Sequence, residues 1–181
     1  MCIRDRYSDR VQRGEPSHLI FEISTVSHLF GGESALLQTV ADQMASLGHH
    51  CMLAIADDPH VAFIWSQWGD GGVIPSGASA LYLAELPFIA LGASDELTQS
   101  MRTLGIATIA QWRQMDAASI AGRYGAEGVR LHRLARGEVL CKGLQWFDQD
   151  SDLTESVDLP EAARQWALIC LLYTSPSPRD S

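Results

Sequence analysis

Residues 17–25 read SHLIFEIST and are followed by VSHLFGGE at 26–33, and this stretch decides how the rest of the chain is interpreted. From Leu19 to Ile23 every second side chain is large and apolar, and β-branched and aromatic residues are frequent. This two-residue period is typical of a strand, so we predict a strand over 18–26. The glycine pair that follows ends the strand and precedes a helical pattern.

The pattern downstream predicts a β-α-β-α order followed by a small helical part, which makes the chain an α+β protein. Apolar residues at helical spacing and capping residues at the ends mark the helices, and short apolar runs mark the strands. We expect helices over 33–47, 57–68, 79–83, 95–104, 109–115, 116–124 and 127–136, and short strands at 51–56 and 73–74. Residues 138–151 read as a linker, and 153–159 as an edge strand ended by Pro160.

Both ends of the chain are predicted to be foreign to the protein. Residues 1–6 (MCIRDR) and 170–181 (CLLYTSPSPRDS) back-translate into two orientations of one transposase adapter used in sequencing libraries. We therefore leave them out of the expected fold, and we expect residues 7–169 to be an internal fragment of a longer protein. These retain two cysteines, Cys51 and Cys141, in no metal spacing, which fits a reduced cytosolic protein.

Charge is distributed unevenly along the chain, whose formal net charge is −9. Residues 102–142 hold seven basic and three acidic side chains, whereas the rest of 7–169 holds three basic and seventeen acidic ones. One basic segment in an acidic protein indicates a localised anionic partner. No apolar run approaches the roughly 18 residues that cross a bilayer, so we expect no membrane partner.

Several short patterns fail as functional motifs. Gly31-Gly32 precedes a helix, but it lacks the lysine and hydroxyl of a nucleotide-binding loop. His49-His50-Cys51 offers metal ligands, but adjacent strand residues point to opposite faces and no second cluster faces them. The G-x-S-x-G of many hydrolases is absent. We therefore expect no metal site and no catalytic residues from these patterns.

A stronger pattern is MRTLGIATI at 101–109, followed by AGRYG at 121–125. Two short helices joined by a glycine-containing turn form a helix-hairpin-helix unit, whose exposed backbone N–H groups bind a phosphate without reading a base. An ordinary helical hairpin is the alternative. Basic residues begin at the same hairpin, and on one continuous helix those at 123, 130 and 133 would share a face. The candidate DNA contacts are Arg102, Gly105, Ile106, Ala107, Thr108, Arg123, Arg130 and Arg133.

A family resemblance joins these segments. Tyr7-Ser8 with Val11, then FEISTVSHLFGGESALL, AIADDPHVAF, LGIATIAQW with AGRYG, and ESVDLPE resemble, in order, the landmarks of the ImuB family, inactive homologues of the Y-family (UmuC/DinB-like) DNA polymerases. HLFGGE is quite specific to that family, whereas the hairpin is common among DNA-binding proteins. The resemblance implies a partial palm at 7–91, a thumb at 92–137, and the start of a little finger at 152–169.

The same resemblance bears on catalysis. Active Y-family polymerases carry an adjacent Asp-Glu pair on this strand, and aligning their L-D-V-T with 21–24 puts Ser17 and His18 at the two acidic positions. Two-metal nucleotidyl transfer needs carboxylates, and Mg²⁺ prefers oxygen anions to an imidazole. Glu22 lies four residues away from the pair. We therefore expect no catalytic residues, with Ser17 and His18 as degenerate positions, and no cofactor.

The resemblance implies a non-catalytic, DNA-binding adaptor in translesion synthesis and the SOS response to DNA damage. The implied partners are damaged or primer-template DNA, the sliding clamp, a RecA-like accessory protein and an error-prone replicative-type polymerase, in the cytoplasm near the nucleoid. One alternative is an active lesion-bypass polymerase that uses Mg²⁺ and a further carboxylate upstream. Another is a protein-interaction scaffold without DNA binding, which the acidic remainder of the chain favours.

Overall fold

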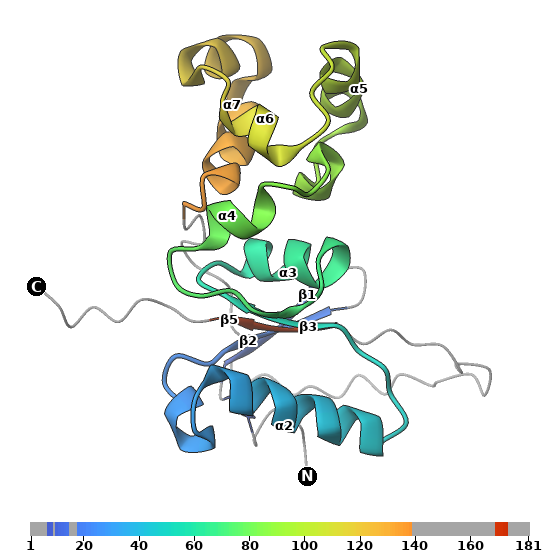
Figure 1. Ribbon diagram of the computed structural model, residues 1–181, viewed down its shortest axis with the longest axis vertical. Helices are drawn as coiled ribbons and strands as arrows, with labels where there is room; N and C mark the ends of the chain where they lie inside the picture. The colour runs from blue at the N-terminus through green and yellow to red at the C-terminus, as the bar shows by residue number, and fades with distance from the viewer. Residues whose placement is uncertain (1–6, 9, 15–17, 139–168, 174–181) are drawn as a thin grey trace, which may run out of the picture.

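The computed structural model describes residues 7–8, 10–14, 18–138 and 169–173, the last five by their backbone alone. A five-stranded sheet in the order β1-β2-β5-β3-β4 lies at one end of the molecule (Figure 1). The outermost pair β1 and β2 is antiparallel, and the remaining neighbours are parallel. The strands are β1 (Val11–Gly14), β2 (His18–Glu22), β3 (Leu53–Ala56), β4 (Gly72–Val73) and β5 (Ile169–Tyr173).

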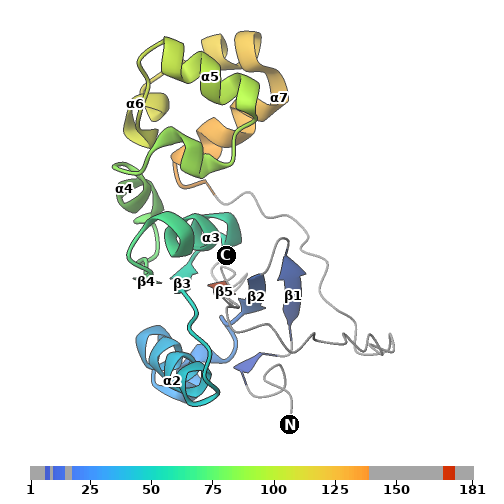
Figure 2. The same cartoon turned by 90° about the vertical axis from the view of Figure 1, so that its right-hand side faces the viewer.

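Helices cover both faces of this sheet and then continue away from it. Helix α2 packs on one face and α3 on the other, and the remaining helices stack beyond α3 (Figures 1 and 2). The helices are η1 (Ser27–Phe30), α2 (Glu33–Ser46), α3 (Pro59–Trp68), α4 (Ser79–Leu83), η2 (Phe88–Leu91), α5 (Asp95–Thr103), α6 (Ile109–Arg113) and α7 (Ala117–Ala135). The predicted β-α-β-α order is therefore present as β2-α2-β3-α3.

Successive side chains of β3 point to opposite faces of the sheet, and each face packs on a different helix. Leu53 and Ile55 face α2 and join a cluster that includes Leu36 of that helix. Ala54 and Ala56 face the other way and join the cluster of α3. Because successive strand residues point to opposite faces, a short apolar run is buried on both sides.

The α3 cluster does not stop at the sheet. It continues through α4 and η2 into the helical part, where Trp112 is fully buried against Phe88 and Tyr124. The boundary expected at 91/92 therefore lies inside one continuous core. We call β1 to β4 with α2 and α3 the sheet layer, and α5, α6 and α7 the helical layer.

Most expected helices are present within a residue or two of their predicted ends. The two basic-segment helices expected at 116–124 and 127–136 form α7, which is broken at Gly125, where φ is 57° and ψ is −147°. Glycine adopts such a positive φ at little cost. The helix end predicted at Tyr124-Gly125 is therefore confirmed. Strand β1 and the 3₁₀ turns η1 and η2 were not predicted.

One predicted strand is shorter than expected, and one segment left out of the expected fold takes part in it. The strand predicted over 18–26 ends at Glu22, because its carboxylate accepts hydrogen bonds from the N–H and hydroxyl of Ser24. The N–H groups of Val26 and Ser27 then turn back to the Ile23 carbonyl, which starts a 3₁₀ turn instead of continuing the ladder.

The second correction concerns the C-terminal segment that we left out of the fold. Strand β5 (Ile169–Tyr173) pairs in parallel with β2 on one side and β3 on the other. Since β2 and β3 are not neighbours, β5 completes the ladder between them, so its backbone takes part in the fold. The linker beyond residue 138 and the strand expected at 153–159 lie outside the described residues.

Candidate nucleic-acid interface

The position expected to have lost a polymerase carboxylate is the start of β2. His18 lies there opposite Gly14 of β1, and its ring stacks on Phe63 of α3 with centroids 4.5 Å apart. Burial lowers the pKa of His18, which favours the neutral imidazole. A Cβ at Gly14 would overlap this ring, so the glycine makes room for it. Ser17, the other degenerate position, lies outside the described residues.

The nearby acids are engaged in other roles. Glu22 is buried and bound to Ser24, as above. Asp57 accepts hydrogen bonds from the Ser76 hydroxyl at 3.1 Å and from the Gly77 N–H at 2.8 Å, which ties the loop after β4 to the end of β3. Burial, and then the charge of Asp57, raises the pKa of Glu33 at the start of α2.

These side chains do not fit a two-metal centre. Within 7–8, 10–14 and 18–138, no three His, Cys, Asp or Glu side chains converge in a way that could hold a metal ion. The expected ligand position carries an imidazole packed on a phenyl ring, whereas Mg²⁺ requires oxygen ligands.

The predicted hairpin joins α5 to α6 through a turn at Gly105, where φ is 74°. Its backbone N–H groups were expected to be exposed for phosphate binding, but two of them are already bonded within the hairpin. Gly105 donates to the Arg102 carbonyl at 3.1 Å and Ile106 to the Met101 carbonyl at 2.9 Å. These two donors are closed by the chain's own backbone.

The other two donors of the hairpin are held by one side chain. The Ala107 and Thr108 N–H groups both donate to Gln111 Oε1, at 2.7 and 3.1 Å. The Thr108 hydroxyl in turn accepts the Gln111 N–H, which completes a capping box at the start of α6. The side-chain oxygen of Gln111, Oε1, therefore occupies the position at which a phosphate oxygen was expected to accept these hydrogen bonds.

The hairpin is also fixed to the segment that leads out of the sheet layer. Phe88 donates its N–H to the Ala107 carbonyl at 2.8 Å, and Ile109 donates to the Leu86 carbonyl at 3.0 Å. A further bond of 2.9 Å runs from Ala110 to the Ala84 carbonyl. Together with the shared core, these bonds hold α6 against the connection between the two layers.

The four candidate arginines do not form one surface row. The break at Gly125 removes the continuous helix that the shared-face prediction required, and it separates Arg123 from Arg130 and Arg133. Arg102 lies in the last turn of α5, where a cation interacts favourably with the helix dipole. The structure thus brings Arg130 and Arg133 together and leaves the other two on separate parts of the helical layer.

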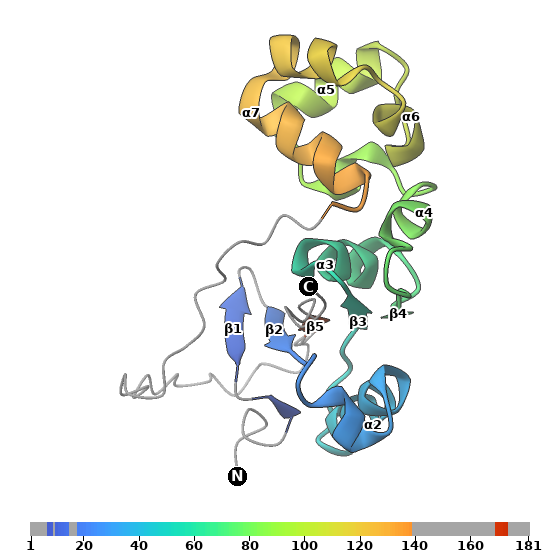
Figure 3. The same ribbon diagram turned by 90° about the vertical axis from the view of Figure 1, so that its left-hand side faces the viewer.

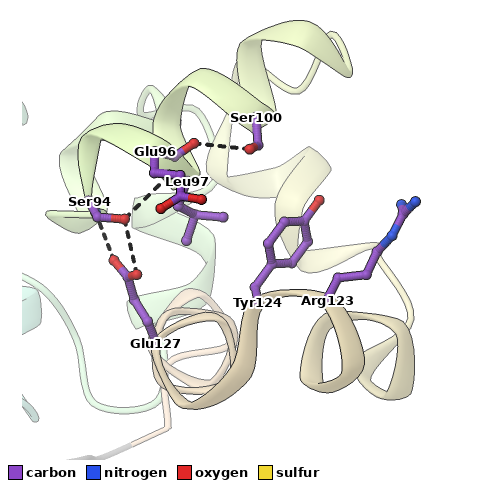
Figure 4. Close-up of a pocket in the computed structure, with 7 residues that line it drawn as sticks. All are labelled: Ser94, Glu96, Leu97, Ser100, Arg123, Tyr124 and Glu127. Carbon is purple, nitrogen blue, oxygen red and sulfur yellow. Dashed lines mark hydrogen bonds between the residues drawn. The ribbon is translucent and has the colours of Figure 1, made fainter.

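Arg123 lines a cavity of about 300 Å³ between α5 and the part of α7 around its break at Gly125 (Figure 4). Glu127 closes one side of it by accepting hydrogen bonds from the Ser94 N–H at 2.7 Å and the Ser94 hydroxyl at 3.0 Å. Tyr124 projects from α7 between Glu127 and Arg123. The cavity therefore contains both signs of charge.

Arg130 and Arg133 line a second cavity, of about 410 Å³, together with His60, Ala126 and Val129. His60 belongs to the first turn of α3, so this cavity joins the two layers. Sequence reasoning missed His60, because its distance from α7 in the chain gives no local signal.

Two further charged residues were not assigned roles from the sequence. Arg113 was counted as basic, but its Nη1 donates to the Ala80 carbonyl at 2.9 Å and so fixes α4 to α6. Glu138 forms an ion pair with Arg133, whose Nε lies 2.7 Å from Glu138 Oε2.

In the described part of the chain, no helix is both long and apolar enough to cross a membrane.

The comparisons with known proteins bear on the same regions. No family model matches the sequence. The chain is 30% identical to Protein ImuB of Caulobacter vibrioides (strain NA1000 / CB15N) over 181 residues, which cover 93% of this chain and 39% of that protein. It is 27% identical to DNA polymerase IV of Methanoculleus marisnigri over 142 residues, which cover 76% of this chain and 39% of that protein.

The chain thus spans about two fifths of the length of the relatives it matches. The matches still extend over most of this chain, through the sheet layer and the helical layer. Similarity to both an ImuB protein and a DNA polymerase IV supports a relationship with the Y-family, UmuC-like polymerases.

Proposed function

We propose that this chain is part of a non-catalytic, Y-family polymerase-like adaptor that holds DNA during translesion synthesis. The observation that carries the proposal is His18: a ring packed on Phe63, with a pKa lowered by burial, stands where the family resemblance expects a metal-binding acid. Because the imidazole is engaged in packing, the position contributes to the fold and offers no anionic oxygen to a metal ion.

The DNA contact is proposed for the helical layer. Arg102, Arg123, Arg130 and Arg133 supply cations, and the hairpin backbone supplies N–H groups. Of those N–H groups, only the Ala107 and Thr108 pair is held by a side chain, so a phosphate oxygen could replace Gln111 Oε1 there. Gly105 and Ile106 would then shape the turn without donating to DNA.

The proposed setting follows the family resemblance. The partners are damaged or primer-template DNA, the sliding clamp, a RecA-like accessory protein and an error-prone replicative-type polymerase, in the cytoplasm near the nucleoid. DNA polymerase IV, a relative over 76% of this chain, favours a second candidate, an active lesion-bypass polymerase dependent on Mg²⁺. A scaffold that does not bind DNA is the third, and the net charge of −9 favours it.

Primer extension by the complete protein with Mg²⁺ or Mn²⁺ separates the first two functions. The adaptor should bind primer-template DNA and add no nucleotide, whereas clear incorporation would exclude it. A matched variant, His18→Glu, restores an acid at this position. We expect it to remain inactive, because one carboxylate facing Phe63 does not rebuild a two-metal centre.

A salt titration separates the adaptor from the scaffold. If about four phosphates are neutralised, the logarithm of the binding constant should fall with the logarithm of salt concentration at a slope of about −3.6. A slope near zero, or no retention of DNA even at low salt, contradicts DNA binding and favours the scaffold.

A further inference from the structure

The basic side chains of the second half of α7 lie where the two layers meet. The cavity of about 410 Å³ is lined by residues of this half-helix and of the start of α3. Helix α3 is the part of the sheet layer on the side of the helical layer (Figures 2 and 3). Its lining combines two apolar side chains, Ala126 and Val129, with Arg130, Arg133 and His60. A single ligand in this cavity would contact both layers.

The two arginines of the cavity differ in their surroundings. Arg130 has no hydrogen bond or ion pair with the part of the chain that the structure describes. Arg133 donates from Nε to Glu138 Oε2 at 2.7 Å, and Arg136 Nε lies 3.7 Å from the other oxygen of the same carboxylate. Glu138 therefore sits between two guanidinium groups at the end of α7, with one oxygen toward each.

All three side chains of this ion pair are about half exposed. An exposed ion pair contributes little to stability, about 0–1 kcal/mol, because water and salt screen it. Its carboxylate can therefore be displaced by a stronger anion at small cost. A phosphate offers a similar pair of oxygens to an arginine and forms charge-assisted hydrogen bonds of the same type.

We propose that the cavity between α3 and α7 binds a phosphate group of the DNA backbone through Arg130 and Arg133, and that Glu138 is an internal competitor for it. This inference rests on the proposed function and assigns it a specific phosphate position and a means of setting affinity. Without DNA, Glu138 neutralises Arg133. When DNA binds, the phosphate takes Arg133 and fills the cavity beside Arg130, so each binding event must displace one carboxylate.

Competition by Glu138 gives a reason for a carboxylate so soon after the end of α7. A free pair of arginines would bind any polyanion in the cell through charge alone. A tethered carboxylate lowers that background, because only a ligand that also reaches Arg130 gains enough to replace it. Removing the Glu138 carboxylate should therefore increase the affinity for DNA more than removing a carboxylate elsewhere on the surface does.

The test compares two variants that remove the same charge. Glu138→Gln loses the competitor, and the control Asp42→Asn loses an exposed carboxylate on α2, on the far face of the sheet. We expect Glu138→Gln to raise the affinity for a short DNA duplex about three- to fivefold at low salt, the size of one exposed ion pair. Asp42→Asn should change it by less than about twofold. Equal effects of the two variants would overturn the proposal.

A double-mutant cycle and a small probe complete the test. Arg133→Gln should lower DNA affinity and remove most of the effect of Glu138→Gln; if Glu138→Gln acts equally in that background, the competition does not run through Arg133. Arg130→Gln should reduce the salt slope by about 0.9.

Inorganic phosphate distinguishes this inference from the proposed function. Titrated into the full chain, it should shift the nitrogen resonances of the Arg130 and Arg133 side chains, and more so in Glu138→Gln. Phosphate binding without DNA retention would reject the adaptor function and the assignment of the phosphate to DNA, while the anion site at Arg130 and Arg133 would stand. Absence of shifts with both phosphate and DNA would reject the phosphate site itself.

Discussion

The sheet layer and the helical layer handle their polar residues in opposite ways. At the start of β2, His18 is packed on Phe63, and Glu22 is bound to the next turn, so chemistry-bearing groups serve the fold. In the second half of α7, Arg130 is exposed, and among the described residues the Arg133 side chain is bound by one exposed carboxylate, that of Glu138. The difference teaches that titratable side chains in the sheet layer are used for packing and turn formation, whereas those at the end of the helical layer stay exposed.

The largest expected effect tests whether the two layers are one cooperative unit. Trp112 is fully buried against Phe88 and Tyr124, in the core that the layers share. Trp112→Ala should lower the free energy of unfolding by about 3–5 kcal/mol, measured by urea denaturation. The control Trp68→Ala, at the half-exposed end of α3, should cost much less.

The number of unfolding transitions shows whether the two layers unfold together. With one continuous core, fluorescence and circular dichroism should report a single transition for the Trp112 variant. Two separate transitions would show that the helical layer unfolds alone, and the boundary at 91/92 would then be a true domain boundary.

The next effect concerns the packing of His18. Gly14→Ala places a methyl group where the imidazole lies, so we expect a loss of about 1–3 kcal/mol from overpacking. The matched control is Gly122→Ala in α7, where a Cβ meets no neighbour. That change should stabilise the protein by about 0.5–1 kcal/mol through helix propensity.

A second substitution identifies the cause. If the ring is the obstacle, Gly14→Ala should be nearly neutral in a His18→Ala background. A full loss in both backgrounds would show that the β1 backbone, rather than the imidazole, requires glycine at this position.

A smaller effect is expected at the hairpin. Thr108→Ala removes the hydroxyl of the capping box and should cost about 1 kcal/mol of stability. Thr103→Ala, which loses only a hydroxyl bonded to the Gln99 carbonyl within α5, is the control and should be close to neutral. Equal losses would mean that the capping box does not hold the start of α6.

Local patterns predicted the helices well because caps and periodicity act within a few residues. The helix ends and the glycine break in α7 could be recognised in the sequence. Long-range pairing could not. Strand β5 between β2 and β3, and the position of His60 beside α7, depend on contacts between distant segments.

The candidate site was predicted only in part, because its arrangement also depends on contacts between distant segments. The arginines were found from composition, but their grouping depends on the angle introduced at Gly125. The occupation of the hairpin donors depends on the rotamer of Gln111, and the neutralisation of Arg133 depends on where the chain goes after α7. Sequence spacing indicates which residues are charged, and packing decides which of them are available.

The smallest predicted effects are pH-dependent, and they separate the two layers. Burial lowers the pKa of His18 below the usual 6.5, so the unfolded chain binds its proton more readily than the folded one. The stabilising contribution is complete above about 6.5 and is lost as the pH falls through the lowered folded value. In the helical layer, the hydrogen bonds from Ser119 lower the pKa of Asp116 below 3.8. Its contribution is complete above about 3.8 and is lost at lower pH.

His18→Gln should therefore flatten the dependence of unfolding free energy on pH between about 7 and 5 and leave the acid limb unchanged. Asp116→Asn should flatten the pH dependence of the unfolding free energy only below about pH 4, where the wild-type cap becomes protonated. Urea denaturation across this range measures both. If His18→Gln retains the wild-type slope near pH 6, the imidazole is solvated in the folded protein, and the contrast between a packed sheet-layer histidine and an open helical-layer surface is wrong.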